Sequence, residues 1–151
     1  MKPAERLRYL VLAAQRDGNR VLAGALAPLG LTPAQAEAIR VVADYGPLSL
    51  TALGELLVCE AGTNPSRLVD RVVSAGLVER TVDVADRRRV TLQLTDAGRA
   101  IEAGVAQVEA GLAAAIAERL AAVPDLDAVL SALEELTGGM PAGEAYRRRV
   151  G

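Results

Sequence analysis

Apolar residues along the chain recur mostly at the spacing of one helix face, which predicts a mainly helical protein. Two of the predicted helices are long: one spans residues 5–29, and the other begins after Thr95 and ends before Pro124. Shorter helices are predicted for residues 32–44, for about two turns from Thr51, from Asn64 to just before Gly76, and for the leucine-rich stretch after Pro124. The tail from Gly138 lacks this pattern, so we expect it to be loose apart from a short turn around Tyr146.

Capping residues define several of these boundaries. Thr32 is followed by Pro33 and Gln35, a combination that predicts an N-cap, a first helical residue and a capping box. The hydroxyl of Thr51 is expected to cap the third helix, and Asn64 with the proline after it to start the fourth. These signals divide the first half of the chain into four helices.

Two short runs rich in β-branched residues follow the fourth helix, at 77–82 and 90–94, and predict a hairpin with the polar segment 83–89 as its protruding loop. Two small helices placed directly before a two-stranded wing make a winged helix-turn-helix. We therefore expect a mainly α fold with a two- or three-stranded wing sheet and further helices at both ends. Because no repeat and no long linker divides the chain, residues 1–151 are expected to form a single domain.

The charges along the chain are polarised. The formal net charge of −2 argues at first against a polyanionic partner. However, residues 62–99 hold seven Arg and five acidic residues, whereas residues 100–146 hold one Arg and eight acidic residues. One surface can therefore meet phosphates while another stays away from them.

The fourth predicted helix carries polar residues on the face opposite its apolar stripe, and an α-helix fits the major groove of B-DNA. The candidate DNA-contacting residues on this helix are Asn64, Ser66, Arg67 and Arg71. Arg67 is the best candidate for a base contact. Taken alone, the same pattern fits the solvated face of a surface helix equally well.

The hairpin loop adds three consecutive arginines. Arg87, Arg88 and Arg89 stand at its tip, where they can enter a minor groove or pair with flanking phosphates. Without further context, such a run is more often a solubilising charge cluster. Its position beside the fourth helix favours the DNA-binding interpretation.

Four short segments of the chain match motifs of one known family. They are LVDRVVSAGLVER at 68–80, DVADRR at 83–88, LTDAG at 94–98 and LTPAQ at 31–35. The first resembles the end of the recognition helix and the first wing strand of the MarR family of transcription regulators, the second and third together resemble that family's wing signature, and the fourth resembles the entry to its second helix. The chain departs from the family in the link from Cys59 to Thr63, which is longer, and in lacking a Ser-rich start to the recognition helix.

The resemblance implies a homodimer whose first and last helices intertwine. It assigns residues 31–98 to a winged DNA-binding part and residues 4–30 and 99–138 to a helical dimerisation part. It also implies that Asp83 and Asp86 stabilise the wing, with an ion pair from Asp83 to Arg87 or Arg88. Independently, the apolar stripes of the terminal helices are too extensive for one small head to cover, which indicates an interface. The alternative is that these stripes fold back into an intramolecular bundle.

The expected function is that of a ligand-responsive repressor that binds double-stranded DNA at a pseudo-palindromic operator. Members of the family often respond to a small effector between the dimer helices and the head, where Tyr9, Arg16 and Tyr45 are conceivable lining residues. The alternative function is a winged-helix module that contacts proteins and does not bind specific DNA.

Other classes of function lack the residues they need. The chain has no His, a single Cys and no glycine-rich phosphate loop, so we expect no enzyme, no metal and no cofactor. Cys59 could sense oxidants, as a cysteine does in some relatives, but a small buried thiol is the commoner use of the residue. No secretory signal or apolar run of about 20 residues is evident, so a cytoplasmic protein without membrane contact is expected.

Overall fold

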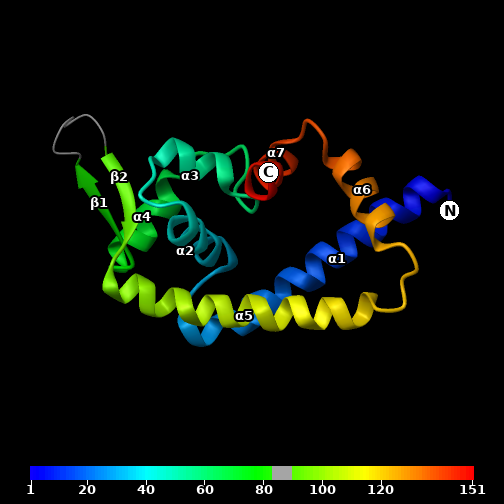
Figure 1. The fold of residues 1–151 in the computed structure, drawn as a ribbon, viewed down its shortest axis with the longest axis horizontal. Coiled ribbons are helices and arrows are strands. Elements are labelled where there is room, and N and C mark those ends of the chain that lie inside the picture. The colour runs from blue at the N-terminus through cyan, green and yellow to red at the C-terminus, as the bar shows by residue number, and fades with distance from the viewer. Residues whose placement is uncertain (83–89) are drawn as a thin grey trace.

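The computed structural model describes residues 1–82 and 90–151 and confirms a mainly α winged helix-turn-helix with helices at both ends (Figure 1). In chain order the elements are α1 (Pro3–Leu26), a 3₁₀ turn η1 (Ala27–Leu29), α2 (Pro33–Tyr45), α3 (Leu50–Leu56), α4 (Ser66–Ser74), β1 (Val78–Val82), β2 (Val90–Leu94), α5 (Asp96–Leu120), α6 (Leu126–Thr137) and α7 (Pro141–Val150).

The wing is a two-stranded antiparallel sheet. Its register pairs Val78 with Leu94 at one end and Val82 with Val90 at the other. Leu48 adds a one-residue bridge to Leu92, through backbone hydrogen bonds in both directions. The wing is thereby tied to the segment before α3.

A single apolar core joins α2, α3, α4, the wing and the first turns of α5. Its central side chains are essentially inaccessible to solvent: Leu26, Ile39, Leu53, Leu57, Val69, Val72, Leu92 and Val105. Among the described residues no polar or charged residue is buried in this core. We call residues 22–82 and 90–105 the head.

The remaining long helices extend away from the head (Figure 1). We call residues 3–21, 106–120 and 126–137 the arm, which comprises most of α1, the second part of α5 and all of α6. No residue of the arm is buried. Its apolar side chains face solvent, including Leu10 at 64% and Leu130 at 46% exposure.

Two of the predicted helix starts are corrected and two are confirmed. The capping box at Thr32 and the N-cap at Thr95 are present. Helix α3 is capped by Ser49, whose hydroxyl accepts a hydrogen bond from the Ala52 amide at 3.1 Å, and not by Thr51. The helix begins one residue before Thr51, so that residue already lies inside its first turn. The second correction, at the start of α4, is described with the candidate interface.

The expectation of a loose tail after Gly138 is wrong, because the tail folds into α7. This helix packs on α3 and α6 and buries Gly143 and Ala145. A Cβ on Gly143 would lie 2.2 Å from the Thr137 carbonyl oxygen, so the corner between α6 and α7 requires glycine. A helix of 10 residues gains most of its stability from tertiary packing, which a local pattern does not reveal.

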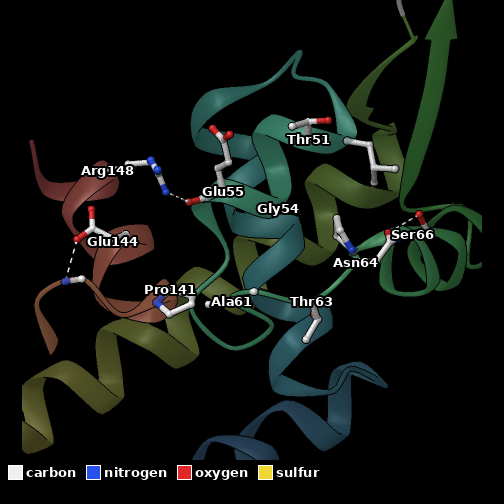
Figure 2. A pocket seen from close by; sticks show the side chains of 14 residues that line it. Thr51, Gly54, Glu55, Ala61, Thr63, Asn64, Ser66, Pro141, Glu144 and Arg148 are labelled. Atoms are coloured by element: carbon white, nitrogen blue, oxygen red, sulfur yellow. Dashed lines mark hydrogen bonds between the residues drawn. The ribbon is translucent and has the colours of Figure 1, made fainter.

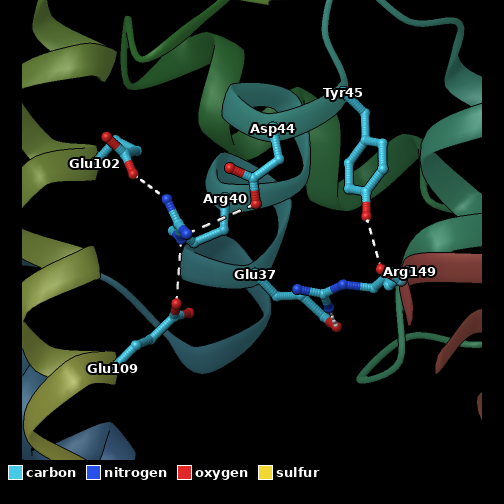
Figure 3. A network of polar contacts seen from close by, with 7 residues as sticks. All are labelled: Glu37, Arg40, Asp44, Tyr45, Glu102, Glu109 and Arg149. Carbon is cyan, nitrogen blue, oxygen red and sulfur yellow. Dashed lines mark hydrogen bonds and ion pairs between the residues drawn. The ribbon is translucent and has the colours of Figure 1, made fainter. Parts of the chain in front are cut away.

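Helix α5 is long and apolar enough to cross a membrane by length and composition alone. Its contacts point to a different role. Glu102 and Glu109 of α5 both pair with the Arg40 guanidinium of α2, which also lies 3.6 Å from Asp44 (Figure 3). Polar contacts therefore fasten α5 to the head, while most of the helix stays exposed.

Candidate nucleic-acid interface

Helix α4 presents one apolar and one polar face. Leu68, Val69 and Val72 pack into the core, whereas Arg67 and Arg71 are exposed. The two arginines are separated by one helical turn and so project from the same side. Within residues 1–82 and 90–151, neither guanidinium forms an ion pair, so both can serve an anionic partner.

The start of α4 differs from the prediction by one residue. Pro65 takes the N-cap position, and Ser66 is the first helical residue. Asn64 still acts at this end, because its Oδ1 atom accepts hydrogen bonds from the Ser66 amide at 3.0 Å and from the Ser66 hydroxyl at 2.6 Å. These two candidates therefore bond to each other, which leaves the amide nitrogen of exposed Asn64 at the tip of the helix.

A salt bridge connects the exposed face of α4 to the wing. Asp70 of α4 accepts from Arg80 of β1 at 2.5 Å, and both side chains remain about half exposed. An exposed pair of this kind contributes little to stability, about 0–1 kcal/mol. Its consequence is geometric, because it holds the first wing strand against the helix that carries Arg67.

The junction between the wing and α5 explains the Leu-Thr-x-x-Gly motif. The Thr95 hydroxyl accepts from the Gly98 amide at 2.9 Å and donates to the Gly76 carbonyl at 2.6 Å. A Cβ on Gly98 would lie only 1.9 Å from the Leu77 carbonyl oxygen. Glycine at this position lets α5 approach the start of β1, and thereby sets the angle at which the wing leaves the head.

The remaining wing candidates lie outside the described residues. These are Asp83 and Asp86, expected to stabilise the wing, and Arg87, Arg88 and Arg89, expected to contact DNA. The strands that flank them, β1 and β2, are in the predicted positions.

A hollow of about 740 Å³ lies beside the start of α4 (Figure 2). It is bordered by α3, by the link between α3 and α4, and by α7. Thr51, Asn64 and Ser66 line it from the helix-turn-helix, and Glu144 and Arg148 line it from α7. The Arg148 guanidinium also donates to the Glu55 carbonyl at 3.3 Å, so α7 borders the surface that carries the DNA candidates.

The sequence predicted no more than a short turn around Tyr146 in the segment that forms α7, although two signals for a helix were present. Pro141 stands at the first helical position, and the last turn is basic, as is favourable at a helix C-terminus. Such signals bound a helix but do not say what it packs against.

The three conceivable effector residues lie in different surroundings. Tyr9 of α1 is exposed and stacks beneath the Arg8 guanidinium, whose central carbon is 4.3 Å from the ring centre. Arg16 borders a shallow hollow formed by α1 alone. The hydroxyl of Tyr45 donates to the Arg149 carbonyl of α7 at 3.2 Å.

Cys59 is exposed, whereas the sequence favoured a buried thiol. Its thiol is nonetheless partly desolvated, which together with the nearby Glu37 carboxylate raises the pKa of Cys59 to about 12. A thiol with so high a pKa is almost entirely protonated at neutral pH and therefore a poor nucleophile.

Comparison with known families gives one match, a winged helix DNA-binding domain that covers residues 31–98. The sequence matches none of the curated proteins with which it was compared.

Several solved structures resemble the whole chain. The transcriptional repressor CouR, bound to a 23-mer DNA duplex, is 29% identical with a TM-score of 0.68, and the match covers 91% of this chain and 98% of CouR. A mutant of MarR from E. coli, complexed with operator DNA, is 27% identical with a TM-score of 0.72, and the match covers 88% of this chain and 94% of that one. RV1404 from Mycobacterium tuberculosis is 28% identical with a TM-score of 0.67, over 91% and 96%.

Proposed function

The chain is a MarR-type winged helix-turn-helix transcription regulator that binds DNA, and from this premise we propose that it acts as a homodimer on a pseudo-palindromic operator. In this proposal the arms of two copies associate, and each copy lays α4 in a major groove. Two heads held at a fixed separation then read two half-sites about one helical turn apart.

The exposure of the arm's apolar residues is the main observation in favour of a dimer. Large apolar side chains are exposed on all three helices of the arm, α1, α5 and α6: Leu7, Leu10, Val11, Leu12, Ile116, Val129, Leu130, Leu133 and Leu136. An open apolar groove between α1 and α6 is lined by Leu7, Val129 and Leu133, with two alanines. Patches of this extent on a monomer mark an interface. The arm carries seven acidic residues and five arginines, and this negative balance suits contact with a second copy better than contact with phosphates.

For DNA recognition we assign distinct roles to the two basic groups. Arg67 and Arg71 on the exposed face of α4 would contact bases or phosphates in the major groove. The wing arginines 87–89, which lie outside the described residues, would contact the adjacent minor groove or its phosphates. The heads carry these groups at one end, and the acidic helices α5 and α6 lie farther from the phosphates.

We also propose that the protein is a cytoplasmic repressor whose DNA affinity responds to a small ligand. CouR, to which the chain is similar, is a transcriptional repressor. A hollow of about 400 Å³ at the junction of α2, the wing and α5 offers room for such a ligand, bordered by Val42, Gln93 and Arg99. A ligand there would alter the angle between the head and α5, and so the spacing of two heads.

The DNA-binding proposal is tested by selecting bound duplexes from random DNA with the wild-type protein, and then measuring Arg67→Ala on the best selected duplex. We expect this substitution to cost about 1–3 kcal/mol and to relax sequence preference, because a guanidinium that contacts a base edge would be lost. Arg119→Ala, which removes the same charge from the end of α5 in the arm, is the matched control and should leave affinity nearly unchanged.

The salt dependence of DNA affinity distinguishes contacts to bases from simple attraction to phosphates. If a dimer neutralises about six to ten phosphates, affinity should fall on the order of a thousandfold between about 50 and 200 mM salt. A wing variant such as Arg88→Ala should weaken all sequences evenly, whereas Arg67→Ala should act chiefly on the selected one. A wild-type protein that prefers no duplex over heparin would contradict the proposal and favour a winged-helix module that contacts proteins.

A further inference from the structure

The link that leads into the recognition helix, residues 57–65, is held at its start by a carboxylate from another helix. The backbone amides of Val58 and Cys59 both donate to the side chain of Glu37 in α2, each at 2.8 Å. The Glu37 side chain is only 10% exposed. A nearly buried carboxylate that accepts two amides fixes the direction in which the link leaves α3.

Helix α7 completes this arrangement from the other side (Figure 3). The Arg149 guanidinium donates to the same Glu37 carboxylate at 2.9 Å and is itself only 28% exposed. The Tyr45 hydroxyl bonds to the carbonyl of Arg149 at 3.2 Å and holds the end of α7 in place. Farther along the link, Gly62 adopts a φ of +77°, and a Cβ at this position would lie 3.3 Å from the ring of Pro141.

The link has few internal hydrogen bonds that could fix its path without these contacts. Its own backbone hydrogen bonds are from Ala61 to Val58 at 3.4 Å and from Thr63 to Glu60 at 3.1 Å. The helix that follows has only nine residues and begins at Ser66. A small change in the path of the link would therefore redirect the whole of α4, and with it Arg67.

We propose that Glu37 and Arg149 are positioning residues for DNA recognition, because their ion pair joins α2, α7 and the link in the geometry that presents α4 to the major groove. This inference rests on the proposed DNA-binding function. Neither residue contacts DNA in this proposal. The C-terminal helix thereby becomes a part of the DNA-reading head, in addition to the winged helix-turn-helix itself.

A competing role for Arg149 is a direct phosphate contact, and the two roles predict opposite signs for Glu37→Gln. Removing a negative charge near a polyanion should strengthen binding if electrostatics alone matters. If Glu37 positions the link, the neutral amide loses its charge-assisted bonds to Arg149 and to both amides, and binding should weaken. We expect affinity for the selected duplex to fall about tenfold, as the loss of hydrogen bonds to a charged group implies.

The experiment measures three variants on the selected duplex and on a random-sequence duplex at several salt concentrations. Glu37→Gln and Arg149→Met should each lose about tenfold on the selected duplex and much less on the random one, since misdirected α4 arginines can still meet phosphates. Arg149→Lys should recover part of the loss. Arg147→Met is the matched control on α7, because among the described residues the Arg147 guanidinium bonds only to Glu144 and to the Glu134 carbonyl at the corner with α6.

Tyr45→Phe provides a milder variant in case Glu37→Gln unfolds the head. It removes only the bond to the Arg149 carbonyl, so it should show a smaller loss in the same direction, with an unchanged melting temperature. Equal or tighter binding by Glu37→Gln, or an equal loss by Arg147→Met, overturns the inference. If the wild-type protein itself selects no duplex, the proposed function fails instead, so the two failures are distinguishable.

Discussion

The head and the arm are built from the same kinds of apolar residues but use them differently. In the head, Ile39 and Leu53 are at most 1% exposed, whereas Leu10 and Leu130 of the arm are 64% and 46% exposed. The amphipathic pattern is similar in both regions, so it identifies an apolar face without identifying what covers it. In the head other elements of the same chain cover that face, and in the arm we propose that a second copy does.

Helix α5 contains this difference within a single element. Val105 is fully buried against the head, and Ile116, about three turns later, is 48% exposed. Both belong to one apolar stripe that continues without interruption. The boundary between head and arm is therefore set by tertiary contacts, chiefly with α1 and α2, and not by a change in the helix itself.

Charging the arm should have the largest effect. Leu130→Asp places a carboxylate in the exposed apolar stripe of α6, and should prevent two arms from associating while leaving the core of the head intact. Losing the second head should lower affinity for the selected duplex on the order of 10²–10⁴-fold, because the two half-sites would no longer be bound together. Sedimentation equilibrium measures the oligomeric state, and mobility shift measures the affinity.

Ser131→Asp is the control for this experiment, since it adds the same charge to the polar face of the same helix. It should leave both the dimer and the affinity unchanged. A dimer that survives Leu130→Asp would mean that the arm is not the interface.

Two glycines in α5, Gly98 in the head and Gly111 in the arm, should respond oppositely to replacement by alanine. An alanine at Gly98 would place its Cβ 1.9 Å from the Leu77 carbonyl, so Gly98→Ala should destabilise the protein by about 2–4 kcal/mol. A Cβ at Gly111 meets nothing within 4 Å in the single chain, so the higher helix propensity of alanine should stabilise it by about 0.5–1 kcal/mol. Urea unfolding followed by circular dichroism measures both. A loss at Gly111 would show that another chain approaches this face closely.

Local signals in the sequence were sufficient for most element boundaries. The capping box at Thr32, the cap at Thr95 and the two strands all depend on residues close to one another along the chain, and all are where the pattern places them. The start of α3 shows where such signals fail, because the pattern predicted a cap at Thr51 and the structure has it at Ser49. Both hydroxyls are favoured at N-caps, and Ser49 directly follows the bridge between Leu48 and Leu92, a long-range contact that the local pattern does not reveal.

Long-range contacts could not be predicted in this way. Glu37 and Arg149 are 112 residues apart, and neither has a local pattern that identifies its partner. Helix α7 was missed for the same reason, because it depends on packing against α3 and the corner at Gly143. The exposed face of α4, by contrast, follows from helical spacing alone, which is why Arg67 and Arg71 could be chosen from the sequence.

The smallest effect is expected at Cys59, which lies on the head and whose exposure the sequence did not predict. Because the pKa of its thiol is raised to about 12 in the folded protein, the thiolate is scarce at neutral pH, and peroxide should leave DNA affinity unchanged. The rate of alkylation by iodoacetamide should keep rising between about pH 7 and 10, with no plateau near the ordinary thiol pKa of about 8.5. A plateau below about pH 9 would contradict the raised pKa. The unfolded chain releases this proton first as the pH rises, so the free energy of unfolding should fall above about pH 8.5, and Cys59→Ser should remove that slope.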